Sequence, residues 1–214
     1  GFQGAAPPKR DQTIGHALRE AFSYPSFNLL MAGYFVCGFQ VVFIGVHMPS
    51  YLRDNGLSPQ VASYALALIG LFNVFGTYIA GTLGQRMPRR FILSFIYLAR
   101  AVAISVFLLV PLSPLSVYIF SAVMGTLWLS TVPPTNATIA QIFGVQHLSM
   151  LGGFVFFSHQ LGSFMGVWLG GYLYDATGSY DIVWYIAIGL GVLAGLVNLP
   201  IKEAPIQRAQ PQAA

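Results

Sequence analysis

Six long apolar stretches divide this chain and decide what it can fold into. A helix that crosses a membrane needs about 20 mostly apolar residues, and each stretch comes close to or exceeds that length. The stretches cover residues 27–52, 61–83, 91–110, 115–143, 150–174 and 182–199. Only 7% of the residues are charged, whereas a soluble domain carries about 25%. The pattern therefore predicts an all-α integral membrane protein with six transmembrane helices.

Composition excludes several other classes of protein. A single cysteine, Cys37, rules out a disulfide framework within the chain. The basic residues are dispersed along the sequence, so we expect no nucleic-acid partner even though the isoelectric point is about 9.3. No metalloprotease, nucleophile-elbow, phosphate-loop or CxxC motif occurs. We therefore expect neither an enzyme nor a cofactor or metal site, and the lipid bilayer is the first expected partner.

The loops between the stretches are short, which favours antiparallel neighbouring helices. Ser58 is a plausible N-cap for the second span. If both termini are cytoplasmic, eight basic residues lie inside and only Arg53 lies outside. The eight are Lys9, Arg10, Arg19, Arg86, Arg89, Arg90, Lys202 and Arg208. The positive-inside rule therefore predicts a multi-pass protein of the inner (plasma) membrane with both termini in the cytoplasm.

The segments outside the spans define the expected domain boundaries. Residues 1–22 are expected to be a cytoplasmic linker with a short surface helix over residues 16–22, and residues 23–202 form the six-helix unit. Residues 203–214 are expected to be a cytoplasmic tail, with disorder beginning at Lys202. The chain begins at Gly1 and residues 1–10 lack signal-peptide features, so we expect a fragment of a longer reading frame.

Polar residues inside spans are functional candidates because they are costly there. Arg100 lies mid-span, while all six acidic residues lie in loops or tails. Arg100 must therefore contact backbone carbonyls, polar side chains, another chain or an anionic substrate. Gln40 and His47 are seven residues apart in the first span, nearly two helical turns, so they share one face. We consider cavity lining for both, against simple solvent exposure of His47 near the outer end.

The fourth span is interrupted by Pro133-Pro134, and it carries hydroxyl and amide groups around that point. Interrupted helices mark substrate sites in transporters, but a packing kink satisfied by nearby hydroxyls is equally compatible. The cavity candidates here are Ser130, Thr131, Thr135 and Asn136. In the fifth span His159 and Gln160 either line a cavity or bond to a partner helix. The nearby glycines 162, 166 and 170 permit close approach of another helix.

The loop after the second span reads GTLGQRMPRR. It resembles the G-x-x-x-D-[RK]-x-G-[RK]-[RK] loop motif of the major facilitator superfamily. Gly81, Arg86, Arg89 and Arg90 match the motif, whereas Gln85 replaces its aspartate and Pro88 its second glycine. The segments LRDNGLSP and VPPTNATIAQIFG extend the resemblance, as does the run from His147 to Asp181. The chain is most similar to bacterial members related to monocarboxylate transporters and oxalate/formate antiporters.

This resemblance covers only the second half of a twelve-span transporter, and it implies a fold and a mechanism. The fold would be two inverted three-helix repeats, over about residues 27–110 and 115–200, partnered by an N-terminal six-helix half. The first helix of each repeat would line a central cavity, which suits the candidates on the first and fourth spans. The second helices would pack against the other half, at Gly76 and Gly81 and at Gly162 and Gly166. Arg100 would fall on a peripheral helix.

The expected function is therefore secondary transport of a small organic solute, expected to be a carboxylate, by alternating access, with H⁺ as one candidate coupling ion. Two alternatives stay open. The chain could be a six-helix membrane scaffold without transport activity, or a half-transporter that pairs with a second copy of itself.

Overall fold

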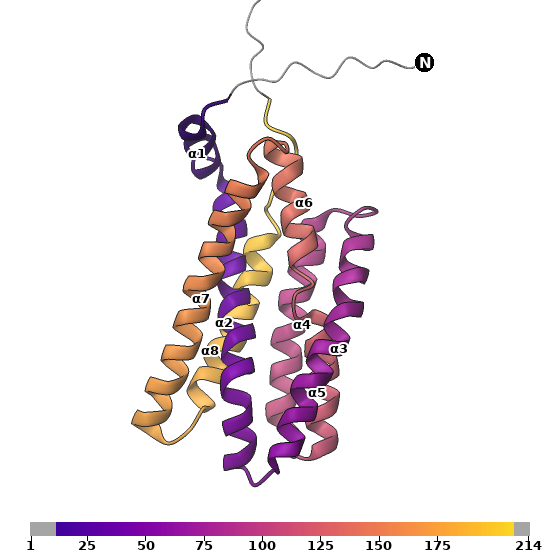
Figure 1. Ribbon diagram of the computed structural model, residues 1–214, viewed down its shortest axis with the longest axis vertical. Helices are drawn as coiled ribbons and strands as arrows, with labels where there is room; N and C mark the ends of the chain where they lie inside the picture. The colour runs from indigo at the N-terminus through magenta and orange to yellow at the C-terminus, as the bar shows by residue number, and fades with distance from the viewer. Residues whose placement is uncertain (1–11, 208–214) are drawn as a thin grey trace, which may run out of the picture.

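A computed structural model describes residues 12–207, and these residues form eight helices and no strand. The helices are α1 (Ile14–Phe22), α2 (Pro25–Asp54), α3 (Pro59–Leu83), α4 (Arg89–Leu109), α5 (Pro114–Leu127), α6 (Val132–Phe143), α7 (Leu148–Thr177) and α8 (Asp181–Asn198). They stand side by side in one elongated bundle, with α1 at one end (Figure 1). The short helix predicted over residues 16–22 is confirmed as α1, which begins two residues earlier.

The predicted spans coincide with helices, and the fourth is divided into α5 and α6 at residues 128–131. Within residues 12–207, five segments are long and apolar enough to cross a membrane, namely α2, α3, α4, the combined α5–α6 and α8. Helix α7 has 30 residues, a length of about 45 Å at the usual helical rise, but it is not among the five. The prediction of six spans is therefore confirmed in part.

Proline and serine set several helix starts. Proline occupies the first helical turn of α2, α3 and α5, where its missing N–H costs no hydrogen bond. Ser113 caps α5 through a reciprocal pair of bonds with Ser116. Ser58 is the N-cap residue of α3, as predicted, although its side chain makes no capping hydrogen bond.

Three helix pairs carry most of the packing: α2 with α7, α3 with α5, and α4 with α8. Glycine allows the backbones to meet in the first two. A Cβ atom on Gly162 would lie 1.9 Å from the carbonyl oxygen of Phe35, and one on Gly76 would lie 1.8 Å from that of Thr126. The close approach predicted for the glycine row of the fifth span is confirmed.

The expectation that these glycines face another half of the protein is wrong. Gly162 and Gly166 contact α2 of the same bundle, and Gly76 contacts α5. The reason is steric, because only a residue without a side chain allows these two backbone pairs to touch.

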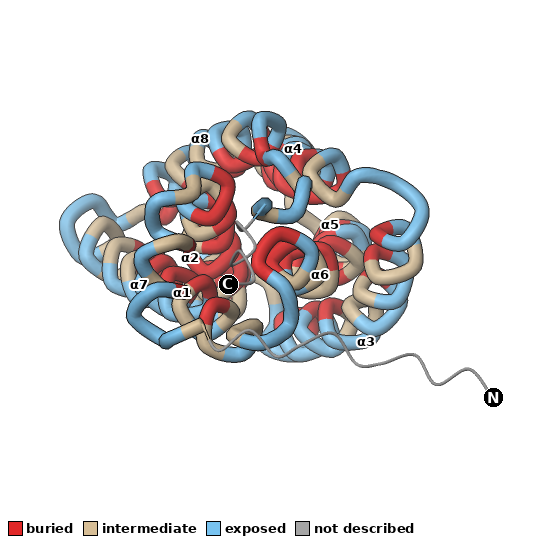
Figure 2. The backbone as a smooth tube through the Cα atoms, turned by 90° about the horizontal axis from the view of Figure 1, so that it is seen from above, coloured by how far each residue is buried: buried red, intermediate tan, exposed pale blue. Residues whose placement is uncertain are grey.

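Helices α2 and α6 lie in the middle of the bundle, between α7 on one flank and α3 on the other (Figure 2). Helices α4 and α8 lie side by side along one edge of the same view. The apolar core follows α2 from end to end: one cluster gathers around Phe43 and Trp184, and another around Phe27 and Leu30. This arrangement leaves broad exposed surfaces on α3 and α7.

The segment after α8 is docked on the bundle through residue 206. Ile201 is fully buried, the Lys202 N–H donates to Ser26 Oγ at 2.9 Å, and the Ile206 N–H donates to the Ile142 carbonyl at 3.0 Å. The expectation of disorder from Lys202 onward is therefore wrong for residues 202–206. The sequence missed this because the anchoring groups lie on α2 and α6, far away in the chain. Residues 208–214 lie outside the described range.

Basic residues are distributed unequally between the two ends of the bundle. The loops α3–α4 and α6–α7, helix α1 and residues 201–207 lie at one end, and the loops α2–α3, α4–α5 and α7–α8 lie at the opposite end (Figure 1). Arg19, Arg86, Arg89, Arg90 and Lys202 thus share an end that excludes Arg53. Lys9, Arg10 and Arg208 lie outside the described residues. We call the first end the basic end.

Candidate functional site

The break between α5 and α6 is the main irregularity of the bundle. Turn hydrogen bonds bridge it, from the Trp128 N–H to Gly125 and from the Val132 N–H to Leu129, both at 3.0 Å. Pro133 and Pro134 follow in the first turn of α6, where they lack N–H groups. The break leaves carbonyl oxygens at the end of α5 and an N–H at Leu129 that need partners from elsewhere.

Arg100 of α4 supplies the donors for the carbonyls. Its Nε and Nη2 donate to the Leu127 carbonyl at 3.1 and 2.6 Å, and Nη2 also donates to the Trp128 carbonyl. The side chain is fully buried, and its guanidinium carbon lies 5.4 Å from the Tyr97 ring centroid. A cation at the C-terminal end of α5 also complements the negative end of that helix dipole. These contacts are those of the packing alternative considered for Arg100.

Asn73 of α3 completes the break from the opposite side. Its Oδ1 accepts a hydrogen bond from the Leu129 N–H at 3.0 Å. Sequence reasoning missed Asn73, although an amide within an apolar span was a usable signal. The break is therefore held by one donor side chain and one acceptor side chain from different helices.

Around the break, the four polar candidates divide into buried and exposed groups. Ser130, Thr131 and Thr135 are buried within the bundle. Asn136 is exposed, with its Oδ1 3.5 Å from the position that a Cβ on Gly152 of α7 would take. Of these four, Asn136 is the group that the described chain presents on its surface, and a cavity role for the other three stays a prediction.

The two candidates of α2 bind different neighbours. Gln40 is fully buried and donates from Nε2 to the Ala187 carbonyl of α8 at 2.8 Å. His47 is half-buried, and its Nε2 lies 2.9 Å from the Val167 carbonyl of α7. Both side chains therefore join α2 to neighbouring helices of this bundle, and the Oε1 of Gln40 is buried without a hydrogen-bond partner.

His159 and Gln160 diverge because adjacent helical residues point about 100° apart. His159 is buried, its ring stacked on Phe156 at a centroid distance of 5.5 Å, and its Nδ1 lies 3.2 Å from Gln160 Oε1. Gln160 itself is exposed. The open surface thus carries Asn136 and Gln160, whereas His159 faces the interior.

An interior polar cluster brings α2, α4 and the break together. Cys37 is fully buried with its Sγ 3.4 Å from Thr131 Oγ1, and it shares a buried cluster with Tyr97 of α4, whose ring lies under the Arg100 guanidinium. Neither Cys37 nor Tyr97 was a sequence candidate. A lone cysteine in an apolar span gives no sequence signal that it meets a break 94 residues further along.

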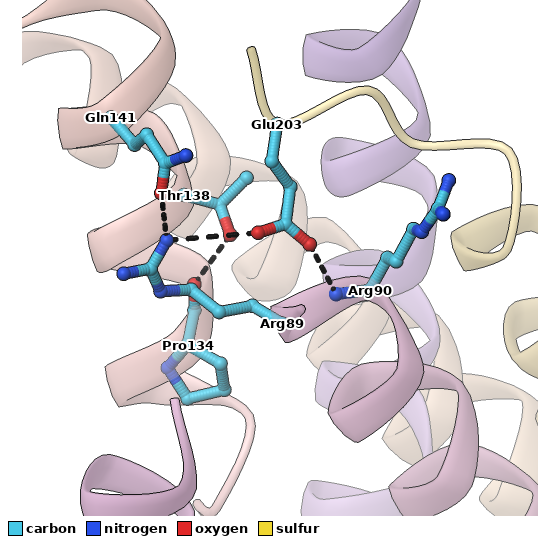
Figure 3. A network of polar contacts seen from close by, with 6 residues as sticks. All are labelled: Arg89, Arg90, Pro134, Thr138, Gln141 and Glu203. Atoms are coloured by element: carbon cyan, nitrogen blue, oxygen red, sulfur yellow. Dashed lines mark hydrogen bonds and ion pairs between the residues drawn. The ribbon is translucent and has the colours of Figure 1, made fainter. Parts of the chain in front are cut away.

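The basic loop motif lies against the segment that follows α8. Glu203 points between Arg89 and Arg90 (Figure 3). Its Oε1 accepts from the Arg90 N–H at 2.8 Å, and its Oε2 lies 3.6 Å from Arg89 Nη1. Arg89 also donates to Gln141 of α6. Glu203 thereby caps the N-terminus of α4, where Pro88 provides no side-chain cap.

The other motif positions surround this contact. Gly81 lies beside α6, since a Cβ there would be 3.7 Å from Pro133 Cβ. Gln85 and Arg86 are exposed in the loop. A hollow of about 430 Å³ between the end of α3 and the start of α6 is lined by residues that include Gly81, Gln85 and Arg89. The loop therefore lies next to the segment that follows the break.

The opposite end is fastened by a tyrosine and a carboxylate. Tyr174 donates from its hydroxyl to Asp54 Oδ2 at 2.8 Å, which joins the ends of α7 and α2. Tyr180, in the loop before α8, stacks on Tyr174 with a centroid distance of 4.5 Å. Burial raises the pKa of the Tyr180 hydroxyl above its ordinary value.

Comparison with known proteins bears on this arrangement. The family model described as Major Facilitator Superfamily matches residues 30–214. The chain belongs to the major facilitator superfamily. The match includes α2 from residue 30 onward, all of α3 to α8, and the loop motif.

Curated relatives in this superfamily are transporters by name. The chain is 27% identical to the uncharacterized MFS-type transporter YcxA of Bacillus subtilis, over 80% of this chain and 43% of that protein. It is 25% identical to monocarboxylate transporter 13 of Bos taurus, over 86% of this chain and 43% of that protein. It is 26% identical to monocarboxylate transporter 12-B of Danio rerio, over 76% of this chain and 35% of that protein. The chain spans less than half the length of these relatives.

Membership and the apolar helices establish a multi-pass membrane protein of a transporter family. Within the described residues, α2 lies in the middle of the bundle and the α5–α6 column is interrupted at residues 128–131.

Proposed function

We propose that this chain is the second six-helix half of a secondary transporter that moves a small organic solute, a carboxylate, by alternating access. The observation that carries the proposal is the interrupted α5–α6 column beside α2 at the centre of the bundle. The chemical reason is that a helix broken inside a membrane is tolerated where protein or a cavity satisfies its backbone. Here the carbonyl side is satisfied by Arg100, and Asn136 stays free on the surface just after the break.

An inverted repeat is supported by the way helices pair. α2 packs on α7 and α8, and the α5–α6 column packs on α3 and α4. Exchanging α2, α3 and α4 with α5–α6, α7 and α8, in that order, converts one set of contacts into the other. The pair of α4 with α8 converts into itself. We infer that two three-helix units related by a pseudo-twofold axis make up this half.

The expected partner is an N-terminal six-helix half of the same transporter. Helices α3 and α7 expose large apolar side chains, including Val74 and Tyr78 on α3 and Phe164 and Trp168 on α7. A contiguous apolar surface needs either lipid or another protein to cover it. We propose that the partner half covers the side where α7, α2, α6 and α3 lie next to one another.

The substrate class rests on the relatives named monocarboxylate transporters. Asn136 and Gln160 supply uncharged donors on the exposed surface, and amide N–H groups can donate to a carboxylate. The partner half would supply any cationic group at the substrate, since Arg100 is buried against carbonyls. A proton gradient is the first driving force to test.

The proposed location is the inner membrane with the basic end in the cytoplasm. Five described basic residues lie at that end and only Arg53 at the other. The positive-inside rule gives this orientation.

Uptake by the full-length protein tests the proposal most directly. Proteoliposomes would be offered radiolabelled monocarboxylates and, as matched controls, the corresponding primary amides, with and without an inward proton gradient. We expect accumulation of a carboxylate that collapses when the gradient is dissipated. Uptake of the amides alone would overturn the substrate class. Normal folding with no uptake of any solute would favour a scaffold.

Thiol labelling tests whether the surface after the break is wet. Cysteine at Asn136 should react with a water-soluble maleimide in membranes, whereas cysteine at the neighbouring, buried Thr135 should not. Cys37 is fully buried and gives little background. Complete protection of position 136 in both inward- and outward-facing conditions would contradict a transport cavity there. Cysteine at His47 should react more slowly, since that ring is half-buried against α7.

A further inference from the structure

A cavity of about 620 Å³ lies at the basic end, between the α3–α4 loop and the segment after α8. Its lining includes four cationic side chains and one carboxylate: Arg86, Arg89, Arg90, Lys202 and Glu203. The proposed transport function gives this cavity no role. Its charge balance calls for a separate explanation.

The single carboxylate is already engaged. Glu203 accepts from the Arg90 backbone N–H and pairs with Arg89 (Figure 3). Within residues 12–207, the side chains of Arg86 and Lys202 have no ion-pair partner. The Arg90 guanidinium carbon instead lies 4.7 Å from the Phe91 ring centroid. Three cations of the cavity are therefore uncompensated by any carboxylate in the described chain.

The start of α4 adds to the positive potential. Its first turn contains Arg89 and Arg90 and no acidic residue. The positive end of the helix dipole favours an anion at this position, and Glu203 already accepts from the Arg90 N–H. Placing two arginines there is electrostatically unfavourable unless a negative group compensates them. Glu203 compensates part of this positive charge, and a bound phosphate group would compensate the rest.

The apolar surface beside the cavity distinguishes a lipid from a free anion. Phe91 is 43% exposed, Phe95 66% and Val102 62%, and these side chains continue down α4 from Arg90. They lie on a helix that is long and apolar enough to span a membrane. A molecule bound by its phosphate in the cavity could therefore lay its hydrocarbon chains along this face of α4.

We propose that the cavity binds the phosphate headgroup of an anionic phospholipid, with its acyl chains along the exposed face of α4. Arg86, Arg90 and Lys202 bind the phosphate, and Phe91 and Phe95 contact the chains. The proposal requires only that the chain lies in a membrane. Its assignment to the cytoplasmic leaflet rests on the proposed orientation.

Native mass spectrometry of the full chain, released from nanodiscs of phosphatidylcholine with and without phosphatidylglycerol, tests the site. We expect preferential retention of phosphatidylglycerol. Arg90→Gln and Lys202→Gln should each weaken retention about fivefold, because one cation near a membrane surface is worth about that factor. Arg19→Gln is the matched control, since Arg19 is an exposed cation at the same end that does not line the cavity. It should leave retention unchanged.

Three outcomes would overturn the proposal. Equal retention of both lipids would remove the headgroup preference, and an equal loss in Arg19→Gln would reduce it to general charge attraction. Displacement of phosphatidylglycerol by inorganic phosphate at matched concentration would assign the cavity to a free anion. Phe95→Ser separates the sources further, because it should weaken lipid retention without changing the response to inorganic phosphate. Nanodiscs have no sidedness, so a failure of this site is distinguishable from a wrong orientation or an absence of transport.

Discussion

Two arginines of α4, Arg100 and Arg89, have their positive charges accommodated in different ways. Arg100 lies fully buried and binds the Leu127 and Trp128 carbonyls, with no carboxylate among its hydrogen-bond partners. Arg89 lies at the N-terminal end of α4. There 19% of its side chain is exposed, and it pairs with Glu203. The middle of the bundle is therefore stabilised by hydrogen bonds from a charged side chain to backbone carbonyls, whereas the basic end is stabilised by an ion pair.

The difference follows from the cost of burying charge. Two opposite charges taken out of water lose solvation that their attraction does not always restore. A single guanidinium facing the negative end of a helix needs only one buried charge and supplies several donors. Near the surface, water limits both the cost and the gain of an ion pair. Stability at the middle should consequently be insensitive to salt, and stability at the basic end should depend on it.

Arg100→Leu should give the largest effect. It removes the donors of two buried carbonyls, and each unsatisfied group costs about 1–3 kcal/mol. We expect a loss of roughly 3 kcal/mol in unfolding free energy, seen as a lower melting temperature and reduced recovery from size-exclusion chromatography. The loss should be the same at low and high salt.

Arg100→Lys sharpens that test. Lysine keeps the charge but cannot reach both carbonyls as a planar fork, so yield should fall more than turnover per folded molecule. A normal yield with abolished uptake would argue against a structural Arg100 and for a substrate or coupling role.

Gly162→Ala should give an intermediate effect at the middle of the bundle. The new methyl group would lie 1.9 Å from the Phe35 carbonyl oxygen, so α2 and α7 must separate, and overpacking of this kind costs about 1–3 kcal/mol. Gly171→Ala on the same helix is the control, because nothing lies within 4 Å of its new methyl group. Equal melting temperatures for the two variants would show that the α2–α7 contact does not limit stability.

The sequence predicts the parts of this structure that depend on local composition. Apolar length located the spans, and Pro133-Pro134 indicated that the fourth is interrupted, although the break lies just before them at residues 128–131. Long-range pairing was not predictable, because no local pattern states that Gln40 bonds α8 or that Asn73 reaches the break. The docking of residues 202–206 was missed for the same reason. Glu203 reads as one acid in a polar tail until Arg90 is seen beside it.

Glu203→Gln should give the smallest effect and the clearest contrast. Glutamine is nearly isosteric and can still accept from the Arg90 N–H, but it removes the attraction to Arg89, which we expect to contribute about 1 kcal/mol or less. The difference in melting temperature from the wild-type chain should shrink as salt is raised, because screening already weakens the ion pair. Asp175→Asn, which changes an exposed carboxylate at the opposite end, is a control for a general loss of negative charge. If the Glu203→Gln difference persisted unchanged at high salt, the carboxylate would act mainly as a cap for α4. The basic end would then be held as the middle is, by hydrogen bonds to backbone, and the contrast between the two arginines would lose its electrostatic basis.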